Sequence, residues 1–128
     1  MHPRRRACQD VAVLSEPEAL RGELQAEGES FLLKVRTDLV WDRDAFARVE
    51  RLMRQACHEL QGEQALERWL VEGFYFMCVQ VPAWTSHPNF RRPEQDYYEA
   101  ALARLEDLHY WFVLGESPYL TGKVWTDL

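Results

Sequence analysis

The chain has 128 residues, of which 47% are hydrophobic and 28% charged, and its formal net charge is −6. Length and composition are those of one soluble globular domain with a single core, so we expect residues 1 to 128 to form one domain that is frayed over residues 1 to 9. An acidic chain is repelled by phosphate backbones. Direct nucleic-acid binding is therefore disfavoured, and a basic protein partner suits the charge better.

The cysteines and the first residues predict a cellular compartment. Cys8, Cys57 and Cys78 are an odd number without close spacing, which predicts a reducing cytoplasm and no disulfides. Three arginines near the start are not followed by an apolar stretch, so these residues do not resemble a secretory signal. No apolar run reaches the length of about 18 residues that a membrane span needs. We therefore expect a cytoplasmic protein that does not contact a membrane.

The first third of the chain predicts a small mixed α/β segment. Residues 10 to 14 are short and mostly apolar, and apolar and basic side chains alternate over residues 30 to 36, as in a half-buried strand. Between them, residues 15 to 27 have the pattern of a short acidic helix, with Ser15 as its N-cap and Pro17 in its first turn.

The pattern changes to a long helix at Asp42, which is a good N-cap. Trp41 and Phe46 stand at the two positions of a hydrophobic staple, and Gly62 suits a left-handed C-terminal cap. The apolar residues between these ends follow one helical stripe. Four charged residues are predicted to face water on the other side: Arg48, Glu50, Arg51 and Arg54.

Residues 63 to 84 predict a second long helix, which ends near Pro82. Few polar residues interrupt its second half, and a helix that is apolar around most of its circumference must be covered on several sides. We therefore expect it to be the central helix. A buried strand over residues 74 to 81 is the competing interpretation, since aromatic and β-branched side chains favour strands. The helical period already set before Leu70 favours the helix.

Residues 91 to 115 predict a third long helix, with Pro93 at its first position and Gly115 at its end. The remaining residues contain Tyr119, Leu120, Val124 and Trp125, which we expect to fold back over the helices. The predicted fold is thus mainly α, with three long packed helices and a small mixed α/β N-terminal segment.

Two features raise the question of a metal or catalytic site. Glu106 and His109 have the Glu-x-x-His spacing of di-iron helical bundles, but the only similar pair, Gln55 and His58, has an amide in place of the carboxylate. We therefore predict no metal and no cofactor. Cys57 and His58 are adjacent on a helix and point about 100° apart, which prevents a nucleophile and base pair; Ser86 and His87 present the same difficulty.

Glu72 lies in an apolar stretch, so it is predicted to be buried and bonded to a cation such as Arg104. A structural ion pair between two helices explains this pattern better than catalysis. No residue is therefore predicted to be catalytic, and we expect the chain not to be an enzyme.

The stretch WTSHPNFRR, residues 84 to 92, has two interpretations. Its hydroxyl and amide side chains can cap backbone groups in a turn, and its aromatic rings can close the end of the helical bundle. The same composition is typical of protein contact surfaces. The second interpretation makes a binding site of five loop residues, with two acidic residues that attract the partner from a distance. These predicted binding residues are Trp84, His87, Asn89, Phe90, Arg91, Glu23 and Glu27.

A small acidic domain without an evident active site is typical of stoichiometric protein binders, such as immunity proteins, antitoxins or inhibitors of nucleic-acid enzymes. The sequence therefore predicts a non-enzymatic protein-binding module that acts on a basic partner. The alternative is a small helical enzyme or ligand-binding protein with a pocket near Glu72, His109 and residues 84 to 89. A homodimer with a structural role is a third possibility, because an aromatic-rich chain can leave apolar surface uncovered.

Overall fold

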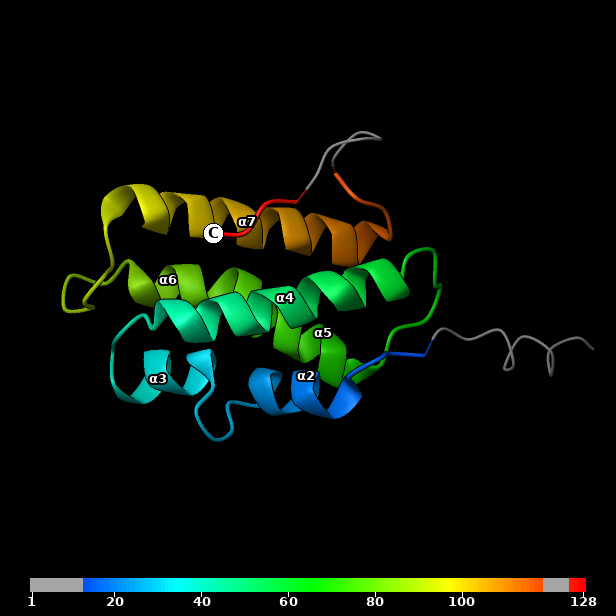
Figure 1. Cartoon of the computed structure of the whole chain (residues 1–128), viewed down its shortest axis with the longest axis horizontal. Coiled ribbons are helices and arrows are strands. Elements are labelled where there is room, and N and C mark those ends of the chain that lie inside the picture. Colours follow the sequence, from blue (N-terminus) through cyan, green and yellow to red (C-terminus); the bar gives the residue numbers. More distant parts are fainter. Residues whose placement is uncertain (1–12, 119–124) are drawn as a thin grey trace, which may run out of the picture.

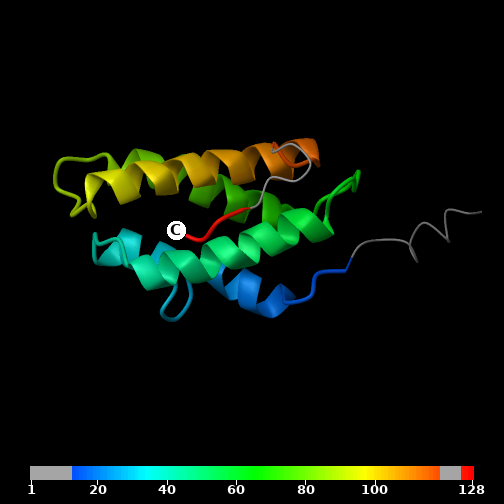
Figure 2. The ribbon, with the colours of Figure 1, turned by 45° about the horizontal axis from the view of Figure 1, so that its top comes forward.

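The computed structural model describes residues 13 to 118 and 125 to 128, and the helices are labelled as in Figure 1. The fold is mainly helical, as predicted. The described residues contain no strand, only a single bridge between Val40 and Arg91. Helix α4 crosses the molecule between α7 on one side and the short α2 and α3 on the other (Figures 1 and 2). None of the helices in these residues is long and apolar enough to cross a membrane.

The N-terminal segment is helical rather than mixed. Helix α2 spans Pro17–Leu24 and α3 spans Phe31–Thr37, so the strand predicted over residues 30 to 36 is wrong. The hydroxyl of Ser30 accepts a hydrogen bond from the Leu33 amide and caps α3. The predicted strand over residues 10 to 14 lies mostly outside the described residues, as do residues 1 to 9. The N-cap of α2 is Glu16, not the predicted Ser15.

Helix α4, Arg43–Glu59, begins where the sequence predicts. Asp42 caps it by accepting a hydrogen bond from the Ala45 amide at 3.1 Å, and the predicted staple residues Trp41 and Phe46 pack with ring centroids 5.1 Å apart. Gly62 has a φ of 82°, but the helix ends earlier, with Leu60 as its C-cap. The predicted solvated face is wrong at Glu50, which is only 3% exposed, and Arg54 beside it is half-buried.

The second long helix is divided into three parts. Helix α5 spans Arg68–Tyr75, a π-helical turn η1 spans Phe76–Gln80 and α6 spans Val81–Thr85. The wide turn lies just before Pro82, whose ring would otherwise clash with the carbonyl four residues earlier. The strand alternative for this region is therefore wrong. The helix begins at Arg68 rather than at residue 63, and it continues through Pro82 to end at Thr85. The helix is also not enclosed on all sides, because Val71, Tyr75 and Val79 are exposed.

Helix α7 spans Gln95–Leu114 and ends at Gly115, which has a φ of 77° as the predicted end requires. It begins two positions after Pro93, with Glu94 as its N-cap. The ring of Trp125 stacks on Trp111 of α7 with centroids 5.1 Å apart, so this residue folds back over the helices as predicted. Tyr119, Leu120 and Val124 lie outside the described residues.

Helices α2 and α5 approach each other closely at Gly73. A Cβ added there would lie 2.5 Å from the Cβ and Cδ1 of Leu24. We expect Gly73→Ala to lower the free energy of unfolding by about 1–3 kcal/mol, because the clash outweighs the gain in helix propensity of about 1 kcal/mol. Gly22→Ala is the matched control: its Cβ would meet only Glu27 Oε1 at 3.7 Å, so the same change should stabilise the protein. Urea unfolding of both variants tests this opposite sign.

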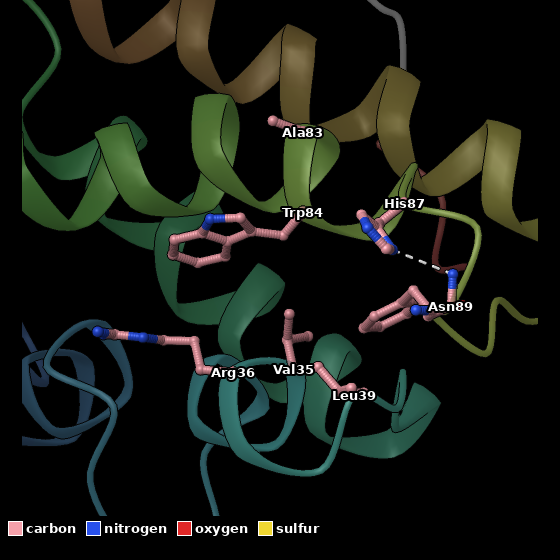
Figure 3. A pocket seen from close by; sticks show the side chains of 8 residues that line it. Val35, Arg36, Leu39, Ala83, Trp84, His87 and Asn89 are labelled. Carbon is pink, nitrogen blue, oxygen red and sulfur yellow. Dashed lines mark hydrogen bonds between the residues drawn. The ribbon is translucent and has the colours of Figure 1, made fainter.

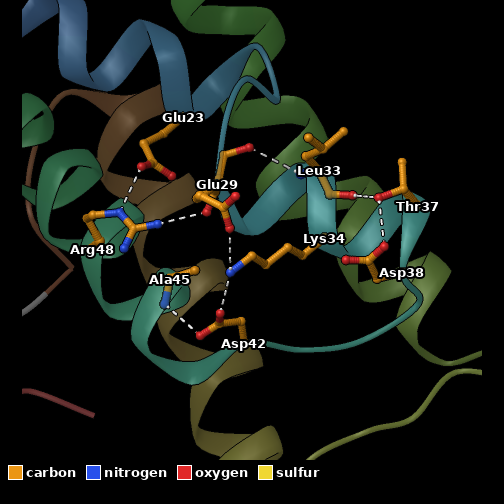
Figure 4. Close-up of polar contacts among 10 residues, drawn as sticks. Glu23, Glu29, Leu33, Lys34, Thr37, Asp38, Asp42, Ala45 and Arg48 are labelled. Carbon is orange, nitrogen blue, oxygen red and sulfur yellow. Dashed lines mark hydrogen bonds and ion pairs between the residues drawn. The ribbon is translucent and has the colours of Figure 1, made fainter.

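A second prediction concerns pH and Asp42 (Figure 4). Lys34 Nζ lies 2.6 Å from Asp42 Oδ2, and this hydrogen bond, followed by that of the Ala45 amide, lowers the pKa of the carboxyl. A lowered pKa means that Asp42 stabilises the fold at neutral pH and that this contribution is lost as the pH falls through its folded-state pKa. Asp42→Ala should cost about 1 kcal/mol at neutral pH through loss of the cap.

The control for this effect is Asp42→Asn, which keeps a capping oxygen but cannot titrate. Its unfolding free energy should fall less steeply with acidification than that of the wild type, measured by urea unfolding between neutral and acid pH. Parallel acid curves for the two proteins would contradict the role of the carboxyl.

Candidate functional site

A groove of about 490 Å³ opens between the end of α3 and the end of α6 (Figure 3). Apolar side chains form most of its surface, with polar groups of Arg36, His87 and Asn89 among them. The lining residues are Val35, Arg36, Leu39, Ala83, Trp84, His87, Asn89 and Phe90. The stretch that the sequence singles out therefore forms one side of a concave surface rather than only a turn.

The α3 side of the groove depends on an uncommon backbone conformation. Leu39 follows the C-cap Asp38 and has a φ of 53°, in the left-handed region that glycine usually occupies after a helix. A branched side chain there carries a conformational cost of about 1 kcal/mol. Leu39 is nevertheless 49% exposed, so burial of its side chain offsets little of that cost. What this leucine does contribute is an apolar wall for the groove.

Trp84 of α6 stacks on Phe76 of η1, and the guanidinium of Arg36 reaches these two rings from α3. The rings of Trp84 and Phe76 stack with centroids 6.2 Å apart, and the guanidinium of Arg36 lies 5.6 Å from the first ring and 5.8 Å from the second. A guanidinium over aromatic faces is attracted by their quadrupoles and keeps its N–H donors available at the edge. Arg36 thus places a fixed positive charge at this end of the groove.

The loop end of the groove presents polar donors. The amide of Asn89 donates a hydrogen bond to Nδ1 of His87 at 3.1 Å (Figure 3). When the imidazole is neutral, its proton therefore resides on Nε2, which becomes a donor. Both side chains are exposed, whereas Phe90 is buried and closes the floor. The loop can thus bind an acceptor group with His87 while its apolar base stays fixed.

Buried contacts beneath the loop hold it in place. The hydroxyl of Thr85 donates to the Val81 carbonyl at 2.8 Å and lies 2.7 Å from the hydroxyl of Tyr98. Since the single Thr85 proton goes to the carbonyl, Tyr98 is the donor of the second bond. The guanidinium of Arg92 donates to the carbonyls of Thr85 and His87. The loop is therefore anchored to both helices that it connects.

The Thr85 and Tyr98 pair provides a third prediction. Thr85→Val should lower the free energy of unfolding by about 1–3 kcal/mol, because it leaves the buried Tyr98 hydroxyl without its acceptor. Tyr98→Phe should cost only about 1 kcal/mol. The double variant should be less destabilised than the sum of the two, measured by urea unfolding as a double-mutant cycle. Additive losses would indicate that the two hydroxyls do not interact.

The structure brings together only some of the predicted binding residues. Trp84, His87, Asn89 and Phe90 share the groove. The exposed Arg91 lies at its border, where its amide donates to the Leu39 carbonyl at 3.4 Å.

The two acidic residues of that prediction belong to another part of the molecule. Glu23 accepts a hydrogen bond from Arg48 at 3.0 Å, in the polar cluster around α2, α3 and α4 (Figure 4). Glu27 is exposed in the turn between α2 and α3. Neither residue lines the groove.

Sequence reasoning missed the α3 half of the groove. The strand predicted over residues 30 to 36 contains Val35 and Arg36, and no element is predicted for Leu39. The sequence nevertheless contains the signal for a helix. Ser30 is a good N-cap, and Phe31, Leu32 and Val35 have the spacing of a helical face; all three are buried. The same seven residues also fit the alternating pattern of a strand. The spacing of the apolar residues alone therefore does not distinguish a helix from a strand over so short a run.

The prediction for Glu72 is wrong. Its side chain is exposed on the outer face of α5, and the buried partner of Arg104 is Glu50, with Arg104 Nη1 and Glu50 Oε2 2.8 Å apart. The pocket proposed near Glu72, His109 and residues 84 to 89 does not form as such. His109 lines a separate depression of about 490 Å³ beside Cys78 and Glu106, which shares no lining residue with the groove.

The chemistry of this second depression does not favour nucleophilic catalysis. Burial raises the pKa of the Cys78 thiol to about 12, so the thiolate is scarce at neutral pH. Burial likewise raises the pKa of Cys57, whose thiol lies 3.7 Å from the Leu108 carbonyl. Within the described residues, no group of three or more His, Cys, Asp or Glu side chains could hold a metal ion.

The groove is therefore the concave surface that four of the predicted binding residues share. It combines apolar walls, a fixed cation and exposed polar donors, and two of its sides come from segments nearly 50 residues apart. Comparison of the chain with protein-family models, with curated proteins and with solved structures finds no match.

Proposed function

We propose that this protein is a non-enzymatic protein-binding module whose groove receives an apolar side chain of a partner. The observation that carries the proposal is the exposed Leu39 in a left-handed conformation opposite the half-buried Trp84. Strained residues persist where they serve a function. Tryptophan and arginine are enriched among the residues that carry most of the binding energy of protein contacts, and this groove presents Trp84 and Arg36 beside the apolar wall of Leu39.

The polar groups of the groove support binding rather than catalysis. Its lining includes two side chains that can carry a proton or charge, Arg36 and His87. The hydrogen bond that orients the His87 ring comes from a backbone amide. No carboxylate lines the groove that could orient this histidine as a general base. Arg36 and His87 can donate hydrogen bonds to an acceptor of a partner. General acid–base catalysis would need a second titratable side chain that points at the same substrate atom.

Two charge signals describe the partner. The net charge of −6 favours attraction of a basic protein over long distances, which is the partner expected from composition. At short range, Arg36, His87 and Arg91 favour a carboxylate close to the inserted apolar side chain. We therefore propose a basic partner with a local acidic and apolar segment, which acts in a stoichiometric complex.

Selection from a displayed library of random peptides tests the groove without knowledge of the partner. We expect enriched peptides to carry a large apolar or aromatic residue next to Asp or Glu. Leu39→Ala and Trp84→Ala should each weaken binding of the enriched peptides at least tenfold, because each removes one wall of the groove. Binding is measured by fluorescence anisotropy with labelled synthetic copies of these peptides.

Leu114→Ala is the matched control for Leu39→Ala, since Leu114 is 57% exposed at the far end of α7 and lines no part of the groove. It should leave binding unchanged. Circular dichroism establishes that each variant is folded. Absence of enrichment, or enriched peptides that bind the groove variants and the wild type equally, would contradict the proposed function.

A further inference from the structure

A second recognition surface lies on the other side of the molecule, where residues 125 to 128 pass between α4 and α7 (Figures 1 and 2). We call these four residues the tail, and the surface beneath them, formed by Arg54, Arg104 and Trp111, the tail-binding surface. Arg104 donates to the Thr126 carbonyl, and Arg54 Nη1 donates to the Trp125 carbonyl at 3.2 Å. The Trp125 ring stacks on Trp111 and lies 5.2 Å from the Arg104 guanidinium.

The side chains of the tail-binding surface are held in place by other groups of the helices. Arg104 Nη1 donates to Glu50 Oε2 at 2.8 Å, and Arg54 Nη2 donates to Glu50 Oε1 at 3.2 Å. The indole N–H of Trp111 donates to Gln61 Oε1 at 3.0 Å. Each of the three recognition groups is therefore oriented without the tail. Preorganised groups lose little entropy when a ligand binds, which favours affinity.

Most of the tail is exposed to solvent. Thr126, Asp127 and Leu128 are exposed, and Trp125 is half-buried. The Asp127 side chain is 94% exposed although its carboxylate lies 3.3 Å from Arg54 Nη2, so this ion pair contributes little. The contacts of the tail include the indole ring and two backbone carbonyls. Segments that bury so little of their surface open locally at low cost in free energy.

From this arrangement we propose that the tail-binding surface is an exchangeable peptide-binding site. Its ligand is an extended segment of another protein chain that presents a tryptophan, and the tail is the built-in competitor that occupies the site until this segment displaces it. The indole would stack on Trp111 while the carbonyls of the tryptophan and the next residue accept from Arg54 and Arg104. Backbone acceptors exist in every peptide, so specificity comes from the indole.

The test uses the full-length chain with Trp125→Ala, in which the competitor has lost its anchor. A fluorescein-labelled peptide of residues 123 to 128, KVWTDL, serves as the probe in an anisotropy titration. We expect saturable binding to this variant. The wild-type chain should bind the probe at least tenfold more weakly, because a tethered tail competes at an effective concentration in the millimolar range.

Variants of the probe and of the protein separate recognition from nonspecific adhesion. Replacing the tryptophan of the probe by alanine should weaken binding at least tenfold, whereas the change that corresponds to Asp127→Asn should alter it by less than about threefold. Arg54→Met in the Trp125→Ala chain should weaken binding several-fold, and Leu39→Ala, which alters only the groove, should not. This last control makes the result independent of the proposed function.

Two outcomes would overturn the proposal. One is the absence of saturable binding to the Trp125→Ala chain and to the wild type. The other is equal binding of the probe with and without its tryptophan. Circular dichroism shows whether the Trp125→Ala chain folds. If it does not, the wild-type chain is titrated with the probe and with the probe that lacks the tryptophan. Binding to the wild-type chain is expected to be weaker, but it must still depend on the tryptophan of the probe.

Discussion

Replacement of Glu50 by alanine is expected to lower the free energy of unfolding by about 3–5 kcal/mol. Glu50 is 3% exposed and accepts hydrogen bonds from Arg104, which is 5% exposed, and from Arg54. Removing the carboxylate leaves a buried guanidinium without its counter-charge, and the cost of that unpaired charge exceeds the loss of the contact itself. Urea or thermal unfolding measures the change.

Glu23→Ala is the control for this prediction, because Glu23 also pairs with an arginine of α4, Arg48, at 3.0 Å. The Glu23 side chain is only 13% exposed, but that of Arg48 is 43% exposed and also donates to the Glu29 carbonyl, so Glu23→Ala leaves a guanidinium that is solvated and still bonded. We expect Glu23→Ala to cost no more than about 1 kcal/mol. Similar losses for the two variants would mean that burial does not determine the strength of the Glu50 and Arg104 pair.

Trp41→Ala should have a comparable effect, with a loss of about 3–5 kcal/mol. Trp41 is 5% exposed and joins α3, α4 and α7 through contacts with four aromatic rings. These rings, with centroids 4.8 to 6.2 Å from that of Trp41, are Phe31, Phe46, Tyr97 and Tyr98. Truncation removes the largest side chain of this cluster and leaves a cavity that the surrounding helices cannot close completely.

Trp41→Phe separates packing from hydrogen bonding at the same position. It keeps an aromatic ring but removes the indole N–H that donates to the Tyr97 hydroxyl at 3.1 Å. We expect a loss of about 1–2 kcal/mol, clearly smaller than that of Trp41→Ala. Thermal unfolding followed by circular dichroism compares the two variants. Equal losses would indicate that the hydrogen bond, rather than the filled volume, is the main contribution of Trp41.

The candidate site shows which features local signals can predict. The composition of residues 84 to 92 predicts a candidate binding loop, because aromatic residues beside histidine and arginine are typical of protein contacts, and four of these residues line the groove. The opposite wall of the groove is not predicted, because Leu39 contributes through a left-handed conformation that no sequence pattern predicts for leucine. The groove exists only because the end of α3 lies against the end of α6.

The two acidic residues Glu50 and Glu72 illustrate the same limit on helices. Both lie next to apolar residues, and the sequence placed Glu50 in water and Glu72 in the core. The structure has the reverse arrangement. A charged residue at the edge of an apolar stripe can be buried only if another helix supplies its counter-charge, and the partner of Glu50 is 54 positions away along the chain.

The sequence by itself determined the helical class and several helix ends, because these depend on residues a few positions apart. Asp42 caps α4, Trp41 packs on Phe46, and Gly115 ends α7, each through contacts within one turn of helix. Only the tertiary structure decided that residues 31 to 37 form a helix, which acidic side chain is buried and where the groove opens. These features depend on contacts between segments distant in the sequence, whose free energy exceeds the small local differences between helix and strand.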